Sequence, residues 1–510
     1  MNLEEAKREY LGGDYKLKHT FELLEGERSA LITRCEKYAG WTLPSVFPLD
    51  THNDNDELQY DFQSVGAKAV THLANKIMMA LFQPSKPFFR MNLTPAQMQE
   101  VQAETGAEKP AIEKMIAAAE RAAGERLNKK NGRVALTEAI ILLIITGNVL
   151  LSIPKGEKIG VYNLRDYVIT RDLRGEVVEL IIRETKKVRG LSDELALLCT
   201  NNGKDPDREV SLYTCAKRVA GDKFLVWQEL ENFAYAHKAP MFVNASDLPW
   251  IPLTWSLARR ADYGNGLVEN YAGDFHTLST LAETILDFTA AATDIKNLVN
   301  PAGMTDVDEI AQAATGAYVT GREEDLFSYS PDVKLQADFL INRFDAAERR
   351  IGSAFLMNSM VTRDAERVTA EEIRMQAQEL ESSLGGVYSR IAVEGQQPLA
   401  RYLMSEDEEI FKSIEPVIVT GLESLSRMSD VDRLRAMLQD AALLADLPEE
   451  VAIRLMFGGV LARLSAGHGV DTEGILATEE QAQATKQQNA EAAAMAAGQE
   501  AGAVAQAQGQ

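Results

Sequence analysis

Two stretches of the chain carry apolar residues that alternate in steps of three and four positions, the spacing of a helix that buries one stripe. The first stripe comprises Leu278, Leu281, Ile285, Phe288, Ala292, Ile295 and Val299, and the second comprises Ala337, Leu340, Phe344, Ala347, Ile351 and Ala354. At a rise of about 1.5 Å per residue, each helix would be roughly 30–38 Å long. The pattern predicts two long helices that pack their stripes against neighbours.

Residues 300–332 connect these two helices and are rich in turn residues, namely Asn300, Pro301, Gly303, Gly316, Gly321 and Pro331. A connection of this length is rarely without structure of its own. We therefore expect a small folded unit with strands or a short helix. The apolar runs AYVT (317–320) and LFSYS (326–330) are the expected strands.

The part of the chain before these helices changes its pattern once. Residues 1–130 read as mainly helical, and Val65–Phe82 is an amphipathic helix that ends before Pro84 and Pro87. Residues 150–260 contain paired β-rich runs around the turns at 172–175 and 220–222, which predict two hairpins. A further strand near 251 leads through a glycine-rich turn into more helix. The fold class is therefore α+β, mainly helical.

The C-terminal third is predicted to be helical with a flexible end. A polar interruption follows Met357, and Thr369 with Glu372 forms a capping box that opens a long helix. Two more helices are expected at 430–446 and 448–465. From about Glu479 the chain consists mostly of Ala, Gln, Glu and Gly, which cannot bury enough apolar surface to offset the entropy of ordering.

Charge and composition limit the functions that can be considered. The formal net charge is −23, so the surface as a whole repels nucleic-acid phosphates. The run Ala139–Ile153 is too short to span a bilayer and reads as a buried helix followed by a turn and a core strand. With a charged N-terminus, it predicts a soluble protein without a signal peptide. Three cysteines without paired spacing predict free thiols in a reducing compartment.

Patterns that carry catalytic or metal chemistry are missing from the sequence. It contains no Walker A motif, no HExxH, no GxSxG and no calcium loop, and its six histidines have no ligand spacing. The run Tyr263–Gly266 lacks the third glycine of a dinucleotide loop and reads as a turn before a helix. We therefore predict no catalytic residues, no metal site and no cofactor.

Two clusters of arginines remain. Arg343, Arg349 and Arg350 alternate with acidic residues on the polar side of the second helix, which indicates a solvated or subunit-bridging face of ion pairs. Arg363 and Arg367 lie in the polar loop after that helix, and by themselves they indicate an ordinary surface turn.

The order of these features and the wording of many segments resemble the portal proteins, or head-to-tail connectors, of short-tailed phages of the Autographiviridae type. The resemblance covers residues 1–480 in unbroken order and rests on SVFPLD, VGAKAVTHLANKIMMALFQPSKPFFRMNL, TGNVLL, LVNPAGMT, TGAYVTGREEDLFSY, AFLMNSMVTRDAERVTAEEIR, LESSLGGVYSRI and GILATEEQ. It implies a portal fold that assembles as a ring, usually of twelve copies.

The resemblance also implies a division of the chain. Residues 1–270, with the β-rich part at 150–260, would form the wing together with 369–429. Stem helix 1 would span 271–299, the clip 300–332, stem helix 2 333–356 and the tunnel loop 357–368. The crown would span 430–475 and a flexible tail 476–510.

The implied function is a channel at one capsid vertex for double-stranded DNA, inward during packaging and outward during ejection. The implied partners are the major capsid and scaffolding proteins, the terminase large subunit, the tail adaptor and the internal core proteins. The protein would reside in the virion, and in the host cytoplasm during assembly. Candidate DNA-facing residues are Asn358, Arg363 and Arg367, and candidate clip docking residues are Asp306, Asp308, Glu309, Arg322, Glu323 and Glu324.

Two alternatives from other classes remain open at the level of sequence. One is a tail adaptor or another structural ring protein of a phage particle. The other is a soluble oligomeric enzyme whose active site follows no known pattern.

Overall fold

A computed structural model describes residues 16–357, 379–404 and 416–418 of the chain, with short gaps at 54, 83–87, 92, 94, 107–108, 155, 202–204, 232–239, 294–295, 330–333, 381 and 385. The chain divides into two units, Met1–Gly421 and Leu422–Gln510, and all described residues belong to the first. The predicted loop residues 358–368, the helices expected at 430–465 and the tail at 476–510 therefore lie outside the described residues.

Helices make up the first described part of the chain, as the sequence predicts. They are α2 (Leu17–Glu27), α3 (Ser29–Trp41), α4 (Val65–Leu81), α5 (Pro95–Thr105) and α6 (Lys109–Lys129). The predicted amphipathic helix at 65–82 is confirmed as α4. Its apolar side is buried in the largest hydrophobic core, which it shares with α3 and α7.

The apolar run at 139–153 folds as the sequence predicts. Helix α7 (Gly132–Thr146) is buried over most of its length and ends at Gly147, whose positive φ of 77° closes the helix in the left-handed conformation. Strand β2 (Asn148–Ser152) follows at once and is fully buried. Within the described residues, no helix is long and apolar enough to cross a membrane.

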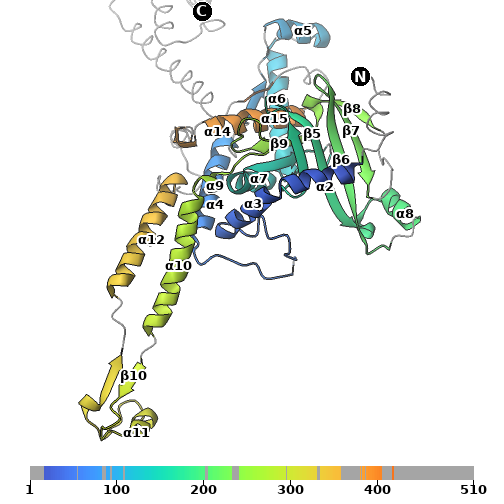
Figure 1. The fold of residues 1–510 in the computed structure, drawn as a ribbon. Coiled ribbons are helices and arrows are strands. Elements are labelled where there is room, and N and C mark those ends of the chain that lie inside the picture. The colour runs from blue at the N-terminus through green and yellow to red at the C-terminus, as the bar shows by residue number, and fades with distance from the viewer. Residues whose placement is uncertain are drawn as a thin grey trace, which may run out of the picture. The chain divides into compact units, whose positions relative to one another are not determined.

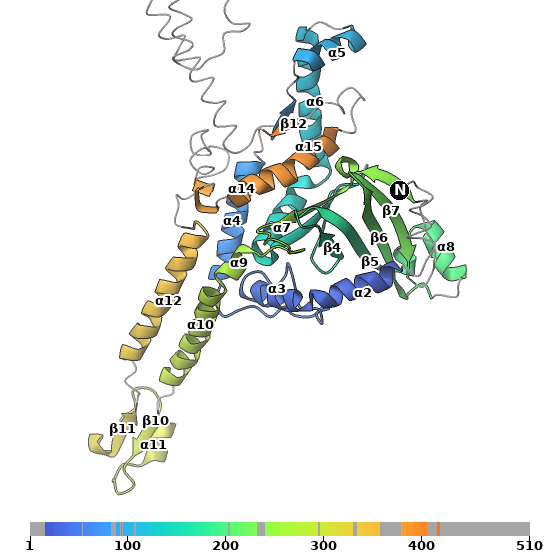
Figure 2. The same ribbon diagram turned by 45° about the horizontal axis from the view of Figure 1, so that its top comes forward.

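Two antiparallel sheets follow. The larger has the order β4-β5-β6-β7-β8, from β4 (Tyr167–Arg171), β5 (Val177–Lys187), β6 (Glu209–Ala220), β7 (Lys223–Leu230) and β8 (Met241–Asn244). The smaller has the order β3-β2-β9, with β3 (Gly160–Tyr162) and β9 (Trp250–Thr254). Both predicted hairpins are confirmed, β4–β5 and β6–β7. Helix α2 covers one face of the larger sheet, where Leu17 and Phe21 pack with Tyr213 and Trp227 (Figure 2).

The remaining elements complete the body and a long hairpin. They are η1 (Val188–Gly190), α8 (Asp193–Asn201), η2 (Ala245–Asp247), α9 (Leu267–Asn270), α10 (Ala272–Thr293), β10 (Lys296–Val299), α11 (Val307–Gln312), η3 (Glu323–Asp325), β11 (Leu326–Tyr329), α12 (Lys334–Ala354), α14 (Gly386–Arg390), η5 (a π-helical segment, Ile391–Gln396) and α15 (Gln397–Met404). A short ladder pairs β1 (Phe89–Met91) with β12 (Pro416–Ile418). The α+β prediction is thus confirmed for the described part of the chain.

The glycine-rich turn at 263–266 packs closely against the end of α7. Asn148, which is buried, donates from its side-chain amide to the carbonyl oxygen of Gly264 at 2.7 Å and accepts from the Gly264 N–H at 2.7 Å. A β-carbon at Gly266 would lie 2.6 Å from the carbonyl oxygen of Ile145, so only glycine allows this approach. The turn holds the start of α9 against the end of α7. The prediction of a turn before a helix is thus confirmed.

Replacing Asn148 with alanine is expected to lower the free energy of unfolding by about 2–3 kcal/mol, because the N–H and C=O of Gly264 would both lose their buried partner. Urea denaturation followed by circular dichroism measures this loss. The matched control is Asn244→Ala, which should change stability little, because its exposed amide bonds the exposed carboxylate of Asp247. Equal losses in the two variants would contradict the assignment.

Candidate functional site: the helical hairpin and its distal subdomain

Helices α10 and α12 form an antiparallel hairpin that extends from the body, which we call the helical hairpin (Figure 1). Near the body its two apolar stripes are buried, at Phe275, Leu278 and Ala282 on α10 and at Ala347, Ile351 and Phe355 at the end of α12. The ring of Phe355 meets those of Tyr271 and Phe275 edge to face, at 6.0 and 5.6 Å between centroids. The predicted stripes are therefore correct at this end of the hairpin.

Away from the body the same stripes are incompletely covered. Ile285, Phe288, Leu340 and Phe344 are only half-buried. Beside them, Leu286 is 54% exposed, Phe339 59% and Ile341 47%. Exposed apolar side chains that follow one another along two helices mark a surface that a further partner can bury.

The polar side of α12 carries the arginines that the sequence singled out. Arg350 bridges to Asp274 on α10, with 2.7 Å between its guanidinium and the carboxylate. The guanidinium of Arg343 lies over the ring of Phe339, 5.3 Å from its centroid. Arg349 lines a small cavity against α4, with Lys68 and His72. At Arg350 the predicted face of ion pairs therefore joins the two helices of one chain.

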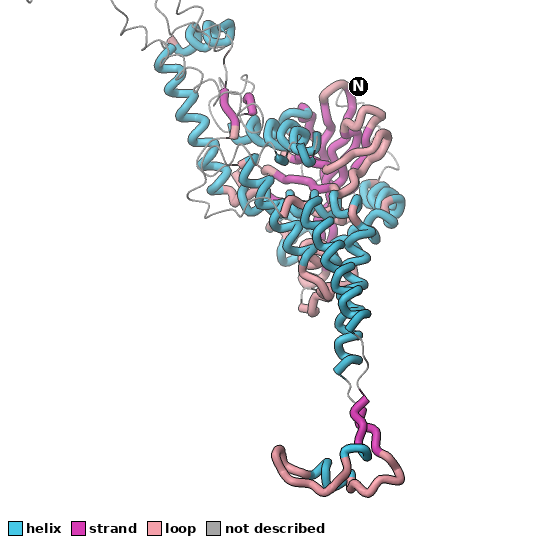
Figure 3. Tube along the Cα trace, turned by 90° about the vertical axis from the view of Figure 1, so that its left-hand side faces the viewer, coloured by secondary structure: helices cyan, strands magenta, loops and turns pink. Residues whose placement is uncertain are grey.

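The distal subdomain, residues 296–329, lies beyond the ends of α10 and α12 (Figure 3). Strand β10 pairs antiparallel with β11, from Lys296 opposite Tyr329 to Val299 opposite Leu326. The strand predicted at 326–330 is thus confirmed over Leu326–Tyr329, and α11 is the expected short helix. Two expectations were wrong. Residues 317–320 form no strand; residues 296–299 supply the second strand instead. The first helix therefore ends at Thr293 and does not continue to Val299.

A buried carboxylate holds the distal subdomain together. Asp325 is 7% exposed and accepts hydrogen bonds from the Thr305 hydroxyl at 2.8 Å and the Met304 N–H at 3.0 Å. The first of these bonds contributes most to lowering the pKa of Asp325 below its usual value. The Thr305 hydroxyl accepts in turn from the Arg322 N–H at 2.9 Å. Gly303 and Gly321 permit the close packing, since a β-carbon at Gly303 would lie 2.5 Å from the Asp325 side chain.

This network brings together the residues predicted to dock a partner, which lie on either side of it. Asp306 caps α11 by accepting from the N–H groups of Asp308 and Glu309, and Arg322 leads into η3. All six predicted residues, Asp306, Asp308, Glu309, Arg322, Glu323 and Glu324, are exposed. Their exposure permits docking, which stays a prediction.

The sequence reading missed the apolar residues of the distal subdomain. Tyr318 is fully exposed, Met304 83%, Phe327 63% and Leu298 54%. Single apolar residues in turn-rich sequence show no periodicity, so no pattern distinguishes them from core residues. Together with the charged set, they give this subdomain a mixed surface of the kind that protein interfaces use.

The predicted DNA-facing residues Asn358, Arg363 and Arg367 lie outside the described residues, but the point where their loop begins is described. Leu356 has a positive φ of 57°, and the Met357 N–H bonds back to the carbonyl oxygen of Gly352 at 2.7 Å, which ends α12.

Lys76 of α4 holds this end of α12. The buried Lys76 donates to the Leu356 carbonyl oxygen at 3.0 Å and pairs with Glu379 at 3.3 Å. Burial, with the charge of Lys76, lowers the pKa of His72. The start of the loop is therefore fixed to the body.

The described residues include the three cysteines and several potential metal ligands. Cys35, Cys199 and Cys215 form no disulfide among the described residues, as the sequence predicts. All three are buried, and burial raises the pKa of Cys35 to about 12. Its thiol is therefore protonated and unreactive at neutral pH. Within the described ranges, no three potential metal ligands from His, Cys, Asp and Glu are grouped together.

Comparison with known proteins agrees with the resemblance in the sequence. Residues 15–476 match the family described as bacteriophage head to tail connecting protein. The portal protein of Escherichia phage T7 is 34% identical over 96% of this chain and 93% of its own length. The portal protein of Enterobacteria phage T3 is 34% identical over 99% and 96%, and that of Enterobacteria phage SP6 is 32% identical over 89% of each.

Among solved structures, the neck of an empty GTA particle aligns with 78% of this chain and 90% of its own, at 15% identity and a TM-score of 0.36, which is too low to support an argument. The family assignment therefore depends on sequence, and there it is unambiguous, since the match spans nearly the whole chain and four portal proteins of phages are 31–34% identical to it. The chain belongs to the bacteriophage head-to-tail connecting proteins, the portal proteins of short-tailed phages.

Proposed function

We propose that copies of this chain form a ring at one vertex of the capsid and that the ring is the channel through which double-stranded DNA is packaged and ejected. Family membership supports a role in the particle, because the relatives are named portal proteins. The observation that carries the ring is the helical hairpin, whose outer half leaves Leu286, Phe339 and Ile341 exposed in a single chain. Adjacent copies in a ring would cover these side chains.

In this proposal the helical hairpin is the stem and the distal subdomain is the clip. The clip docks the terminase large subunit during packaging and the tail adaptor afterwards. Its exposed charges, Asp306 to Glu309 and Arg322 to Glu324, give specificity, and Tyr318 and Met304 supply apolar contact area. A folded unit repeated around the ring axis suits successive partners that bind at the same end.

The net charge of −23 suits a conduit for DNA. A wall that repels phosphates lets the duplex slide, whereas a basic wall would bind it. A few basic side chains suffice to hold DNA after packaging, and we assign that role to the loop that begins at Met357.

Replacing Arg363 and Arg367 with alanine is expected to reduce DNA packaging or retention while rings still assemble, because each removed guanidinium takes away a phosphate contact. Packaged DNA in particles assembled from the variant measures the effect. Replacing Arg189 and Arg208, which are exposed on the body, is the charge-matched control. Normal packaging together with normal retention would show that the loop is only a turn.

Negative-stain imaging with light scattering tests the ring itself. Rings of about a dozen copies around a central hole are expected. If the chain stays monomeric or dimeric even when it is coexpressed with the capsid and scaffolding proteins, the proposal is wrong.

A further inference from the structure

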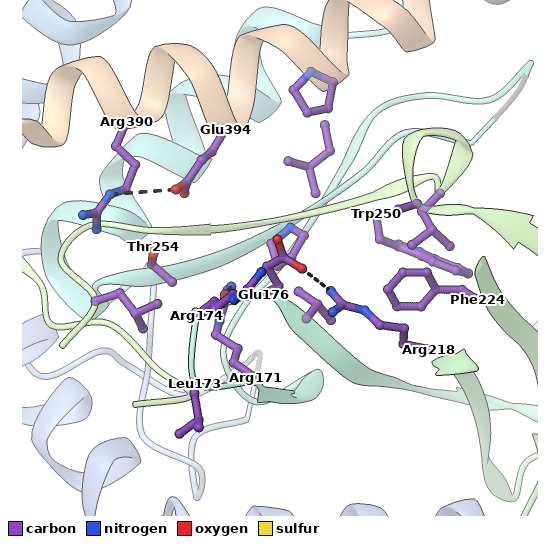
Figure 4. Close-up of a pocket in the computed structure, with 18 of the residues that line it drawn as sticks. Arg171, Leu173, Arg174, Glu176, Arg218, Phe224, Trp250, Thr254, Arg390 and Glu394 are labelled. Carbon is purple, nitrogen blue, oxygen red and sulfur yellow. Dashed lines mark hydrogen bonds and ion pairs between the residues drawn. The ribbon is translucent and has the colours of Figure 1, made fainter. Parts of the chain in front are cut away.

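A second feature lies in the body rather than in the helical hairpin. The β4–β5 turn, β9 with the loop after it, and the segment from the end of α14 through η5 to the start of α15 line a pocket of about 500 Å³, which we call the arginine pocket (Figure 4). Six arginines line it and only two carboxylates, and the arginines are Arg171, Arg174, Arg218, Arg259, Arg260 and Arg390. In a chain whose net charge is −23, this concentration of positive charge is exceptional.

Three of the arginines already have partners. Arg218 pairs with Glu176 at 3.1 Å and with Asp172, which does not line the pocket, at 3.3 Å. Arg390 pairs with Glu394 at 3.8 Å. In Figure 4 these two pairs lie on opposite sides of the pocket, with Arg171 and Arg174 between them.

Arg171 is the third. It donates to the carbonyl oxygens of Gly175 at 2.8 Å and Asp262 at 3.1 Å, and its backbone N–H bonds the Asp262 carboxylate. Burial lowers its pKa. Its guanidinium bonds two neutral carbonyl oxygens, so only the nearby carboxylates of Glu394 and Asp262 offset its positive charge.

The other three arginines are free to bind a ligand. Arg174, Arg259 and Arg260 are exposed at the rim, and the structure shows no ion pair for any of them with another described residue. Arg260 has a positive φ of 68°, which is uncommon for a residue other than glycine.

We propose that the arginine pocket binds a phosphate group. Guanidinium groups bind phosphate oxygens through paired N–H donors, and several unpaired arginines around one cavity suit a dianion better than a single carboxylate. The volume is within the range of sites for small molecules. The phosphate belongs either to a phosphorylated small molecule or to the backbone of a nucleic acid. This site stands independently of the proposed channel.

Thermal unfolding in inorganic phosphate, compared with chloride at equal ionic strength, tests the pocket. Phosphate well above its Kd is expected to raise the Tm of the unmodified protein by about 2–4 °C. The double variant Arg174→Gln, Arg259→Gln should lose this shift, and since both side chains are exposed it should fold normally. The control Arg189→Gln, Arg208→Gln removes the same charge from another part of the body and should keep the shift.

Fluorescence anisotropy with labelled short duplex DNA distinguishes the two sources. Binding that inorganic phosphate displaces and that only the pocket variant loses would assign the site to a nucleic-acid backbone. A phosphate-dependent Tm shift without DNA binding would assign it to a small phosphorylated molecule. Equal Tm shifts in all three proteins, or none, would overturn the proposal. Weaker ring assembly of the pocket variant without any phosphate effect would also overturn it, and would assign the arginines to carboxylates of a neighbouring copy.

Discussion

Replacing Phe355 with alanine is expected to lower the free energy of unfolding by about 3–5 kcal/mol, the usual cost of removing a fully buried phenylalanine. Its side chain is 0% exposed and its ring is the partner of both Tyr271 and Phe275. Such edge-to-face pairs contribute about 0.5–1.5 kcal/mol beyond the buried area. Equilibrium urea denaturation followed by circular dichroism measures the loss.

The matched control is Phe339→Ala on α12, the helix that Phe355 follows. Because Phe339 is 59% exposed in the single chain, its loss should change the stability of the monomer by no more than about 0.5 kcal/mol. If Phe355→Ala costs as little as this control, the base of the hairpin does not depend on the aromatic cluster, and the hairpin would then have to be held to the body mainly by other contacts.

Local periodicity predicted the hairpin well because both helices bury one stripe near the body. The first stripe from Leu278 to Ala292 lies within α10, and the whole second stripe lies within α12, as predicted. The same spacing continued to Ile295 and Val299, so the pattern alone extended the helix into what is a strand. Residues four positions apart, such as Ile295 and Val299, lie on one face of a helix and also on one face of a strand, so their spacing fits both structures.

The strand at 296–299 depends on a partner far along the chain. Its hydrogen bonds go to Leu326–Tyr329, and nothing in the local sequence encodes that pairing. The run 317–320 has suitable β-branched and aromatic residues, yet Tyr318 is fully exposed and the run has no ladder. Pairing across the distal subdomain, rather than propensity, decides which apolar run becomes the strand.

The arginine pocket shows a different limit of sequence reading. Its arginines come from four separate parts of the chain, at 171–174, 218, 259–260 and 390, and no spacing connects them. The arginines that the sequence did single out, on α12, are neighbours in sequence and therefore visible as a cluster. Clusters that only the tertiary fold assembles remain hidden until the strands and loops are placed.

Placing aspartates at Leu286 and Phe339 together is expected to abolish ring assembly and leave the folded monomer intact. Both side chains are more than half exposed, on α10 and α12, and we propose that the neighbouring copy covers them. Losing two such apolar contacts costs about 3 kcal/mol or more at each subunit junction, which weakens association more than about 100-fold. Desolvating the new carboxylates adds to this cost. Light scattering and negative-stain imaging measure the fraction of chains in rings.

The control places aspartates at Leu197 and Val134, which are 63% and 61% exposed on the body and lie away from the helical hairpin. It adds the same number of charges, so any effect of charge alone would appear in both variants. Rings in the control but not in the hairpin variant would locate the contact between copies on the outer half of the hairpin. Rings in both would place that contact elsewhere, and the exposed apolar residues of the hairpin would then be available to another protein of the particle.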